Sequence, residues 1–167
     1  QGEHLADRGV ELVLGRGPPL NRLTGGGGGQ RRLRVGDVAE PVAEHALALS
    51  LALARKLPER ITATSWGKKF AVSLYDSHIV IVGGGGITEE LLSLLAAFKT
   101  RVSVVRKHPK PMSGATEVVG FDQIDQYVAQ ADFVVLAAAL TEETTYLFNE
   151  ESFALMKPTS YLINIAR

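Results

Sequence analysis

The sequence contains no cysteine among its 167 residues, so disulfide bonds and thiolate metal sites are excluded. It also has no excess of charge, because 18 lysines and arginines balance 18 aspartates and glutamates. No net field therefore points to nucleic acid or to a membrane surface as the partner. The longest apolar run is too short to span a bilayer, and the first residues do not form a signal peptide. We expect a cytoplasmic protein without a metal site.

The chain is organised around residues 78–98. Ile79 to Val82 is a β-branched run without a polar break, which is typical of a strand buried on both faces in a parallel sheet. Four glycines, Gly83 to Gly86, follow at once, and residues 87–98 then repeat apolar side chains at a helical spacing. A strand, a glycine turn and a helix in this order direct backbone N–H groups and the positive end of a helix dipole at an anion such as a phosphate.

The glycines fit the dinucleotide-binding pattern G-x-G-x-x-G with one exception. Gly83 takes the tight turn and Gly85 permits close approach to a pyrophosphate, but the third position, which needs a small residue, is Thr88. With a threonine there, either the helix lies farther from the strand, or the hydroxyl caps the helix or reaches a phosphate. Glu89 and Glu90 oppose an incoming pyrophosphate. On this motif alone, a glycine turn without a ligand stays open as the alternative.

Strands and helices alternate along the rest of the chain. The apolar patterns predict strands at residues 9–14, 101–105, 132–136 and 160–165, and helices at residues 41–57, 121–130 and 150–156. This alternation predicts an α/β fold with a Rossmann-type, doubly wound parallel sheet that is incomplete and is preceded by a long buried helix. A ligand is expected at the carboxyl ends of the strands.

Two regions are interpreted from composition and single residues. Residues 15–29 contain a run of five glycines with arginines around it, and a flexible solvated loop is favoured there over a phosphate contact. Because the helix at residues 41–57 is apolar on nearly all sides, His45 is expected to be a packed side chain. Trp66 and Phe70 are expected to cover an edge of the core.

Four stretches in this order resemble the D-isomer-specific 2-hydroxyacid dehydrogenases. They are VAEHALALSLALAR, VIVGGGGI, ADFVVLAAALTEETTYLFNEESFALMKP and YLINIAR. The resemblance implies an NAD(P)-binding Rossmann domain over residues 38–167, with its C-terminal part missing. Residues 1–37 are then the remnant of a substrate domain followed by the flexible glycine-rich loop. It also implies hydride transfer between a nicotinamide cofactor and a 2-hydroxy or 2-keto acid, and a homodimer.

The resemblance also implies roles for individual residues. Arg167 matches the arginine that binds the substrate carboxylate and polarises the carbonyl, which suits a guanidinium. None of the four histidines matches the family's acid/base position, so this chain alone is expected to bind cofactor without turning over a hydroxyacid. The cofactor-binding positions are Gly83, Gly85, Gly86, Ile87, Arg106, Lys107, Ala138, Ala139, Thr144 and Ala166.

Arg106 decides the expected cofactor. It stands at the end of the second predicted strand, where NAD-using relatives carry an acid that binds the ribose hydroxyls. An arginine attracts a 2′-phosphate that an acid repels. NADP is therefore favoured, and NAD stays possible because Arg106 can also be a surface charge at a permissive site. The alternative function is a non-catalytic nucleotide-binding regulatory or corepressor-like module. An S-adenosylmethionine methyltransferase is disfavoured, because it usually needs an acid where Arg106 stands.

Overall fold

The structure is a computed structural model that describes residues 11–14, 38–67 and 71–166. The glycine-rich loop at residues 15–29, Phe70 and Arg167, for which the sequence predicts roles, lie outside this described part. The strands are β1 (Glu11–Leu14), β2 (His78–Val82), β3 (Arg101–Val105), β4 (Glu117–Val119), β5 (Phe133–Leu136) and β6 (Tyr161–Asn164). The α-helices are α2 (Ala39–Ala54), α3 (Leu57–Ile61), α4 (Gly86–Leu95), α5 (Ile124–Val128) and α6 (Glu150–Leu155), and the 3-10 turns are η1 (Ala96–Phe98) and η2 (Phe121–Gln123).

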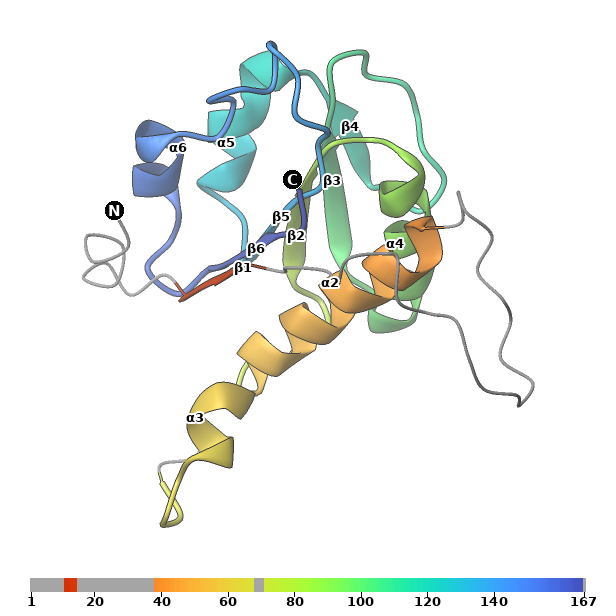
Figure 1. Cartoon of the computed structure of the whole chain (residues 1–167). Helices are drawn as coiled ribbons and strands as arrows, with labels where there is room; N and C mark the ends of the chain where they lie inside the picture. The colour runs from red at the N-terminus through yellow and green to blue at the C-terminus, as the bar shows by residue number, and fades with distance from the viewer. Residues whose placement is uncertain (1–10, 15–37, 68–70, 167) are drawn as a thin grey trace, which may run out of the picture.

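The described strands form one parallel sheet in the order β1-β6-β5-β2-β3-β4 (Figure 1). Counted from β2, the strands β2 to β6 stand in the order 3-2-1-4-5 of dinucleotide-binding folds, and β1 lies beside the fifth. The order reverses between β2 and β5, so a crevice is expected outside their carboxyl ends. The predicted doubly wound α/β fold is confirmed.

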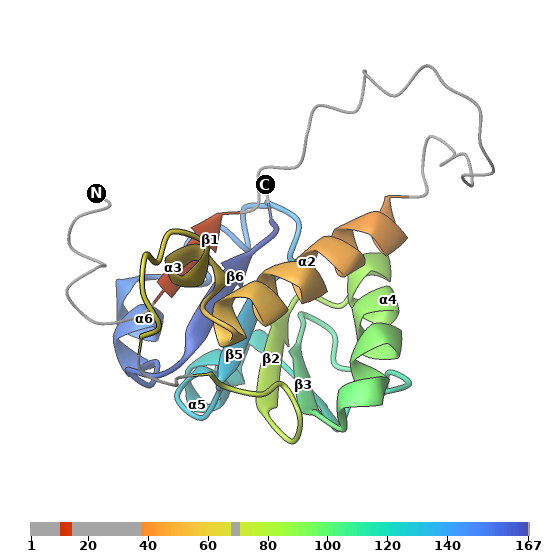
Figure 2. The same ribbon diagram turned by 90° about the horizontal axis from the view of Figure 1, so that it is seen from below.

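Helices cover both faces of the sheet and enclose two cores. Figure 2 shows α2 and α4 on one face and α5 and α6 on the other. Ile79 and Ile81 of β2 belong to the core under α2 and α4, whereas Val80 and Val82 belong to the core under α5 and α6. Since successive strand residues point to opposite faces, every position of β2 needs an apolar side chain, and the unbroken β-branched run supplies it.

Helix α2 is buried on one side only. Ala43, Ala46 and Leu53 are fully buried on the side that packs against α4 and the sheet. Glu44 and His45 are exposed. The long helix that was expected to be buried between other elements thus packs against α4 and the sheet through one face. The prediction that His45 is a packed side chain is wrong for the described chain, because His45 lies on the opposite, exposed side of α2. Within the described residues, no helix is long and apolar enough to cross a membrane.

Residues 55–67, which follow α2 and include α3, project from the rest of the structure and are called the arm (Figure 1). Lys56 adopts the left-handed conformation with φ 50° and separates the two helices, and Pro58 lies in the first turn of α3. The chain therefore starts a second helix at Leu57, whereas the predicted helix over residues 41–57 continued to that residue. Trp66 is 101% exposed. The prediction that it covers a core edge is wrong, because the arm carries it away from the sheet.

The sequence pattern missed β4. This strand of only three residues pairs with β3 at the sheet edge, and its burial does not alternate clearly. The helix predicted at residues 121–130 is confirmed in part, as η2 followed by α5. The strand β4 was missed because three residues are too few to show an alternating pattern.

His78 is a buried polar side chain at the amino end of β2. Its Nδ1 lies 3.2 Å from the Gln130 carbonyl oxygen and its Nε2 lies 2.9 Å from Ser103 Oγ. Because a carbonyl oxygen only accepts, Nδ1 carries the proton in the neutral ring and Nε2 accepts from Ser103. Burial lowers the pKa of His78 below its usual value of 6.5, and nearby Arg101 and Lys157 lower it further, against the opposing effects of Gln130 and Asp132.

This lowered pKa predicts that the fold loses stability in mild acid. Between the native pKa of His78 and about 6.5, the unfolded chain binds more protons than the native chain, so the free energy of unfolding decreases as pH falls. Urea unfolding followed by circular dichroism at pH 7.5, 6.5 and 5.5 measures this decrease. His78→Gln, which does not titrate, is expected to show a shallower decrease. The same pH dependence in both proteins would contradict the assignment.

Candidate functional site

Gly83 joins the end of β2 to its neighbours at very close range. Its φ is +116°, which L-residues with side chains rarely adopt. Its N–H donates to the Val105 carbonyl of β3 at 2.8 Å, and a Cβ on Gly83 would lie 2.7 Å from the Ala138 nitrogen. Only glycine fits both the conformation and the space, as the fingerprint requires of its first position.

Thr88 takes the place of the third fingerprint glycine. Its side chain is fully buried, and its hydroxyl donates to the Gly83 carbonyl at 2.8 Å. The hydroxyl thus satisfies the strand-end carbonyl and attaches the first turn of α4 to β2. It neither caps the helix nor faces outward toward a ligand, so those two expectations for Thr88 are wrong.

The beginning of α4 leaves a set of backbone donors open. Within the described residues, the N–H groups of Gly84, Gly85, Gly86 and Ile87 donate to no protein acceptor. Gly85 is exposed in an extended conformation, and a Cβ placed on it would meet no atom within 4 Å. These donors and the helix dipole favour a negative group in the open space. Glu89 in the same turn is exposed and adds an opposing charge.

Two basic residues border the glycine turn. The Arg106 side chain lies over Gly84, where a Cβ would be 2.7 Å from Cδ and 2.8 Å from Nε of the arginine. The Arg106 N–H donates to the Val119 carbonyl of β4 at 2.9 Å, which fixes the backbone at the end of β3. Lys107 forms an ion pair with Glu143, in the segment between β5 and α6.

The segment after β5 supplies the other side of the edge. The Thr144 hydroxyl donates to the Ala139 carbonyl at 2.6 Å, and the Thr141 N–H donates to Thr144 Oγ1 at 2.8 Å. The side chain of Thr144 therefore stabilises the turn over residues 139–144. Beyond β6, the Ala166 N–H donates to Asn164 Oδ1 at 3.0 Å. A hollow of about 130 Å³ lies between these segments and is lined by Val82, Leu136, Ala138, Ala139, Leu140, Thr144, Leu147, Phe148, Asn164 and Ala166.

The described candidate residues thus gather at the carboxyl ends of β2, β3, β5 and β6, at the upper end of the sheet in Figure 1. Arg167 follows the same edge in sequence but is outside the described residues. Sequence reasoning missed Glu143, Leu147 and Phe148. The adjacent apolar pair Leu147–Phe148 within a polar loop was a readable signal. Glu143 gave none, because its partner Lys107 is 36 residues away.

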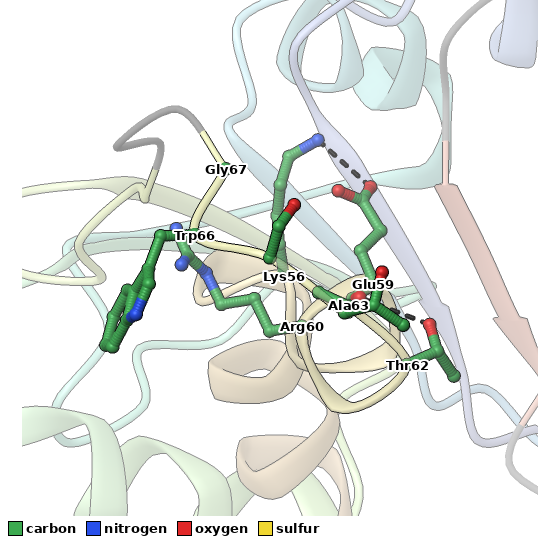
Figure 3. Close-up of a pocket in the computed structure, with 9 residues that line it drawn as sticks. Lys56, Glu59, Arg60, Thr62, Ala63, Trp66 and Gly67 are labelled. Atoms are coloured by element: carbon green, nitrogen blue, oxygen red, sulfur yellow. Dashed lines mark hydrogen bonds and ion pairs between the residues drawn. The ribbon is translucent and has the colours of Figure 1, made fainter.

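A larger hollow of about 890 Å³ lies on the arm and contains none of the candidate residues. Figure 3 shows Lys56 and Glu59 pointing toward each other, with an Nζ–Oε1 distance of 3.1 Å, while Trp66 points away from them. The Thr62 hydroxyl donates to the Glu59 carbonyl at 3.2 Å. Size alone does not make this hollow the functional site, since the open backbone donors are at the glycine turn.

The sheet order, the glycine turn and the open helix end define a Rossmann-type nucleotide-binding domain. Residues 47–167 match the NAD binding domain of the D-isomer specific 2-hydroxyacid dehydrogenases, and the chain belongs to that family. It is 34% identical over 137 residues to a glyoxylate reductase of Pyrococcus furiosus, covering 75% of this chain and 41% of the relative.

Solved structures agree with the sequence match. Phosphoglycerate dehydrogenase from Lactobacillus plantarum superposes with a TM-score of 0.70 at 29% identity, over 77% of this chain and 43% of that one. An acyclic imino acid reductase in complex with NADPH and D-Arg superposes with a TM-score of 0.69 at 26% identity, over 77% and 43% of the two chains. The chain spans less than half the length of these relatives.

The geometry at Gly83 predicts a strict need for glycine. Gly83→Ala is expected to lower the free energy of unfolding by about 1–3 kcal/mol, because it combines a positive φ with a steric clash. Gly85→Ala, with extended backbone and open space, is expected to cost about 1 kcal/mol or less. Urea denaturation of both variants measures the difference. Equal losses would show that the close approach at Gly83 is absent in solution.

Proposed function

We propose that the chain binds the pyrophosphate of a nicotinamide dinucleotide at the beginning of α4. The observation that carries this proposal is the set of open N–H groups from Gly84 to Ile87 beside the unobstructed Gly85. A diphosphate is an anion that such donors and the helix dipole favour. Gly83, Gly85, Gly86 and Ile87 are then the phosphate-binding positions. Membership of a family whose matched domain is an NAD binding domain supports the same ligand.

We propose that NADP is preferred and that NAD is also accepted. Arg106 lies over Gly84 at the end of β3, where an acid in NAD-binding relatives would hold the ribose hydroxyls. Its guanidinium and the neighbouring Lys107 ammonium attract a 2′-phosphate. The acyclic imino acid reductase that superposes on this chain was solved in complex with NADPH, which supports this preference. The rest of the cofactor is proposed to bind in the hollow of about 130 Å³, against Ala138, Ala139, Thr144 and Ala166.

The reaction proposed for the whole protein is hydride transfer between the cofactor and a 2-hydroxy or 2-keto acid. A bound nicotinamide supplies or accepts the hydride. Arg167 is proposed to grip the substrate carboxylate through two parallel hydrogen bonds and to stabilise charge on the carbonyl oxygen. We assign residues 38–167 to the cofactor domain and residues 1–37 to the end of a substrate domain and a loop. The 167-residue chain is proposed to bind cofactor without hydroxyacid turnover.

We also propose a homodimer. Leu47 and Leu51 of α2 pack against the core but stay only partly buried, and Ala48 is exposed beside Glu44 and His45. An apolar helix face of this kind is covered when a second copy packs on it. Sedimentation equilibrium of the purified chain measures this association.

The proposed phosphate site predicts a binding defect that does not depend on folding. Gly85→Val, at the N-cap of α4, is expected to lower the free energy of unfolding by about 1 kcal/mol, so that the chain stays folded. It is expected to weaken NADPH binding at least about tenfold, because the valine side chain fills the space in front of the N–H donors and a hydrogen bond to a charged group contributes about 1.5–3 kcal/mol. Isothermal titration calorimetry measures the affinity. Gly67→Val, at an equally open glycine on the arm, is the matched control and is expected to bind normally. If titration of the folded wild-type chain with NADPH and with NADH released or absorbed no heat of binding, the proposal would be refuted.

The proposed cofactor preference predicts a second, selective effect. Arg106→Gln is expected to lower the ratio of NADPH to NADH affinity by about tenfold, because a charged contact to the phosphate is lost while the ribose hydroxyl of NADH loses little. Arg101→Gln removes the same charge at the opposite end of β3 and serves as the control. An unchanged ratio in Arg106→Gln would exclude Arg106 from the site.

A further inference from the structure

The Lys107–Glu143 ion pair joins two segments that follow different strands of the sheet. Lys107 follows β3 by two residues, and Glu143 lies in the segment between β5 and α6. Both β3 and β5 pair directly with β2, one on each side. The ion pair therefore connects the segments that follow β3 and β5, the two strands that flank β2.

The charges on this edge are unequally matched. Within the described residues, Lys107 forms an ion pair with Glu143, whereas Arg106 forms none. The side chains of Lys107 and Glu143 are 51% and 56% exposed, so the pair is open to solvent and to a competing anion. Glu142, the preceding residue, is also exposed but forms no ion pair in the described chain.

We propose that Glu143 is a specificity-determining residue that competes with the 2′-phosphate of NADP for Lys107. This inference rests on the proposed cofactor site. A carboxylate beside the lysine neutralises one of the two cations that attract the phosphate. The 2′-hydroxyl of NAD carries no charge and is not subject to that competition. Glu143 therefore narrows the advantage that Arg106 and Lys107 give to NADP and keeps NAD acceptable.

The size of the effect follows from the exposure of the pair. An exposed ion pair contributes up to about 1 kcal/mol, because water and salt screen the charges. Removing the competitor is therefore expected to improve NADPH affinity about two- to fivefold. Higher ionic strength reduces both the ion pair and the phosphate contact, so the effect is largest at low salt.

The test compares four variants with the wild-type chain by calorimetric titration with NADPH and with NADH at low salt. Glu143→Gln is expected to bind NADPH about two- to fivefold more tightly and NADH with unchanged affinity. Glu142→Gln removes the same charge one residue away and is expected to change neither affinity appreciably. The double variant Lys107→Gln/Glu143→Gln is compared with Lys107→Gln alone, and no gain is expected because the lysine is absent.

Each contrary result overturns the inference in an identifiable way. Equal gains for both cofactors in Glu143→Gln, or the same gain in Glu142→Gln, would indicate a general charge effect. A gain that persists without Lys107 would show that Glu143 acts through another group. Unchanged NADPH affinity in Glu143→Gln, with normal binding by the wild type, would refute the competition and leave the cofactor site intact. Absence of binding by the folded wild type would refute both.

Discussion

The close approach of three elements at Gly83 is the constraint on which the rest of the structure depends. Its backbone bonds to β3, its missing side chain lets the chain after β5 approach, and its carbonyl accepts the buried hydroxyl of Thr88 in α4. A side chain here would separate β2 from β5 at the point where the strand order reverses. The crevice and the direction of α4 therefore follow from one residue without a Cβ.

Thr88 shows how a fingerprint position can change without loss of its packing role. A third glycine permits close contact of helix and strand because it is small. Thr88 is larger, but it is fully buried and replaces the space requirement with a hydrogen bond to Gly83. A buried carbonyl at the strand end needs a donor, and the hydroxyl supplies one. The backbone donors of Gly84 to Ile87 stay open because Thr88 points inward, toward the sheet.

The sequence predicted those features that depend on local periodicity. The unbroken run of β2, the helical spacing of α4 and the glycines between them indicated the fold and the sheet edge at which the described candidate residues lie. Burial of single residues was harder to predict, because it depends on neighbours that the local pattern does not contain. His45 is exposed since only one side of α2 meets α4 and the sheet, and Trp66 is exposed since Lys56 bends the chain into the arm. The ion pair of Glu143 with Lys107 depends on strand order, which brings β3 and β5 to opposite sides of β2.

Strand order also explains why the charges at this edge come from different sources. Arg106 and Lys107 are neighbours in sequence, so any change in the connection after β3 alters both. The opposing carboxylates come from separate segments, with Glu89 in the first turn of α4 and Glu143 beyond β5. The balance of charges at this edge therefore depends on the assembled sheet. The residues around the end of β3 contain the two cations but neither of the two carboxylates. A preference for NADP that is proposed from Arg106 alone takes no account of these carboxylates, because they lie elsewhere in the sequence; the proposal for Glu143 brings one of them into the argument.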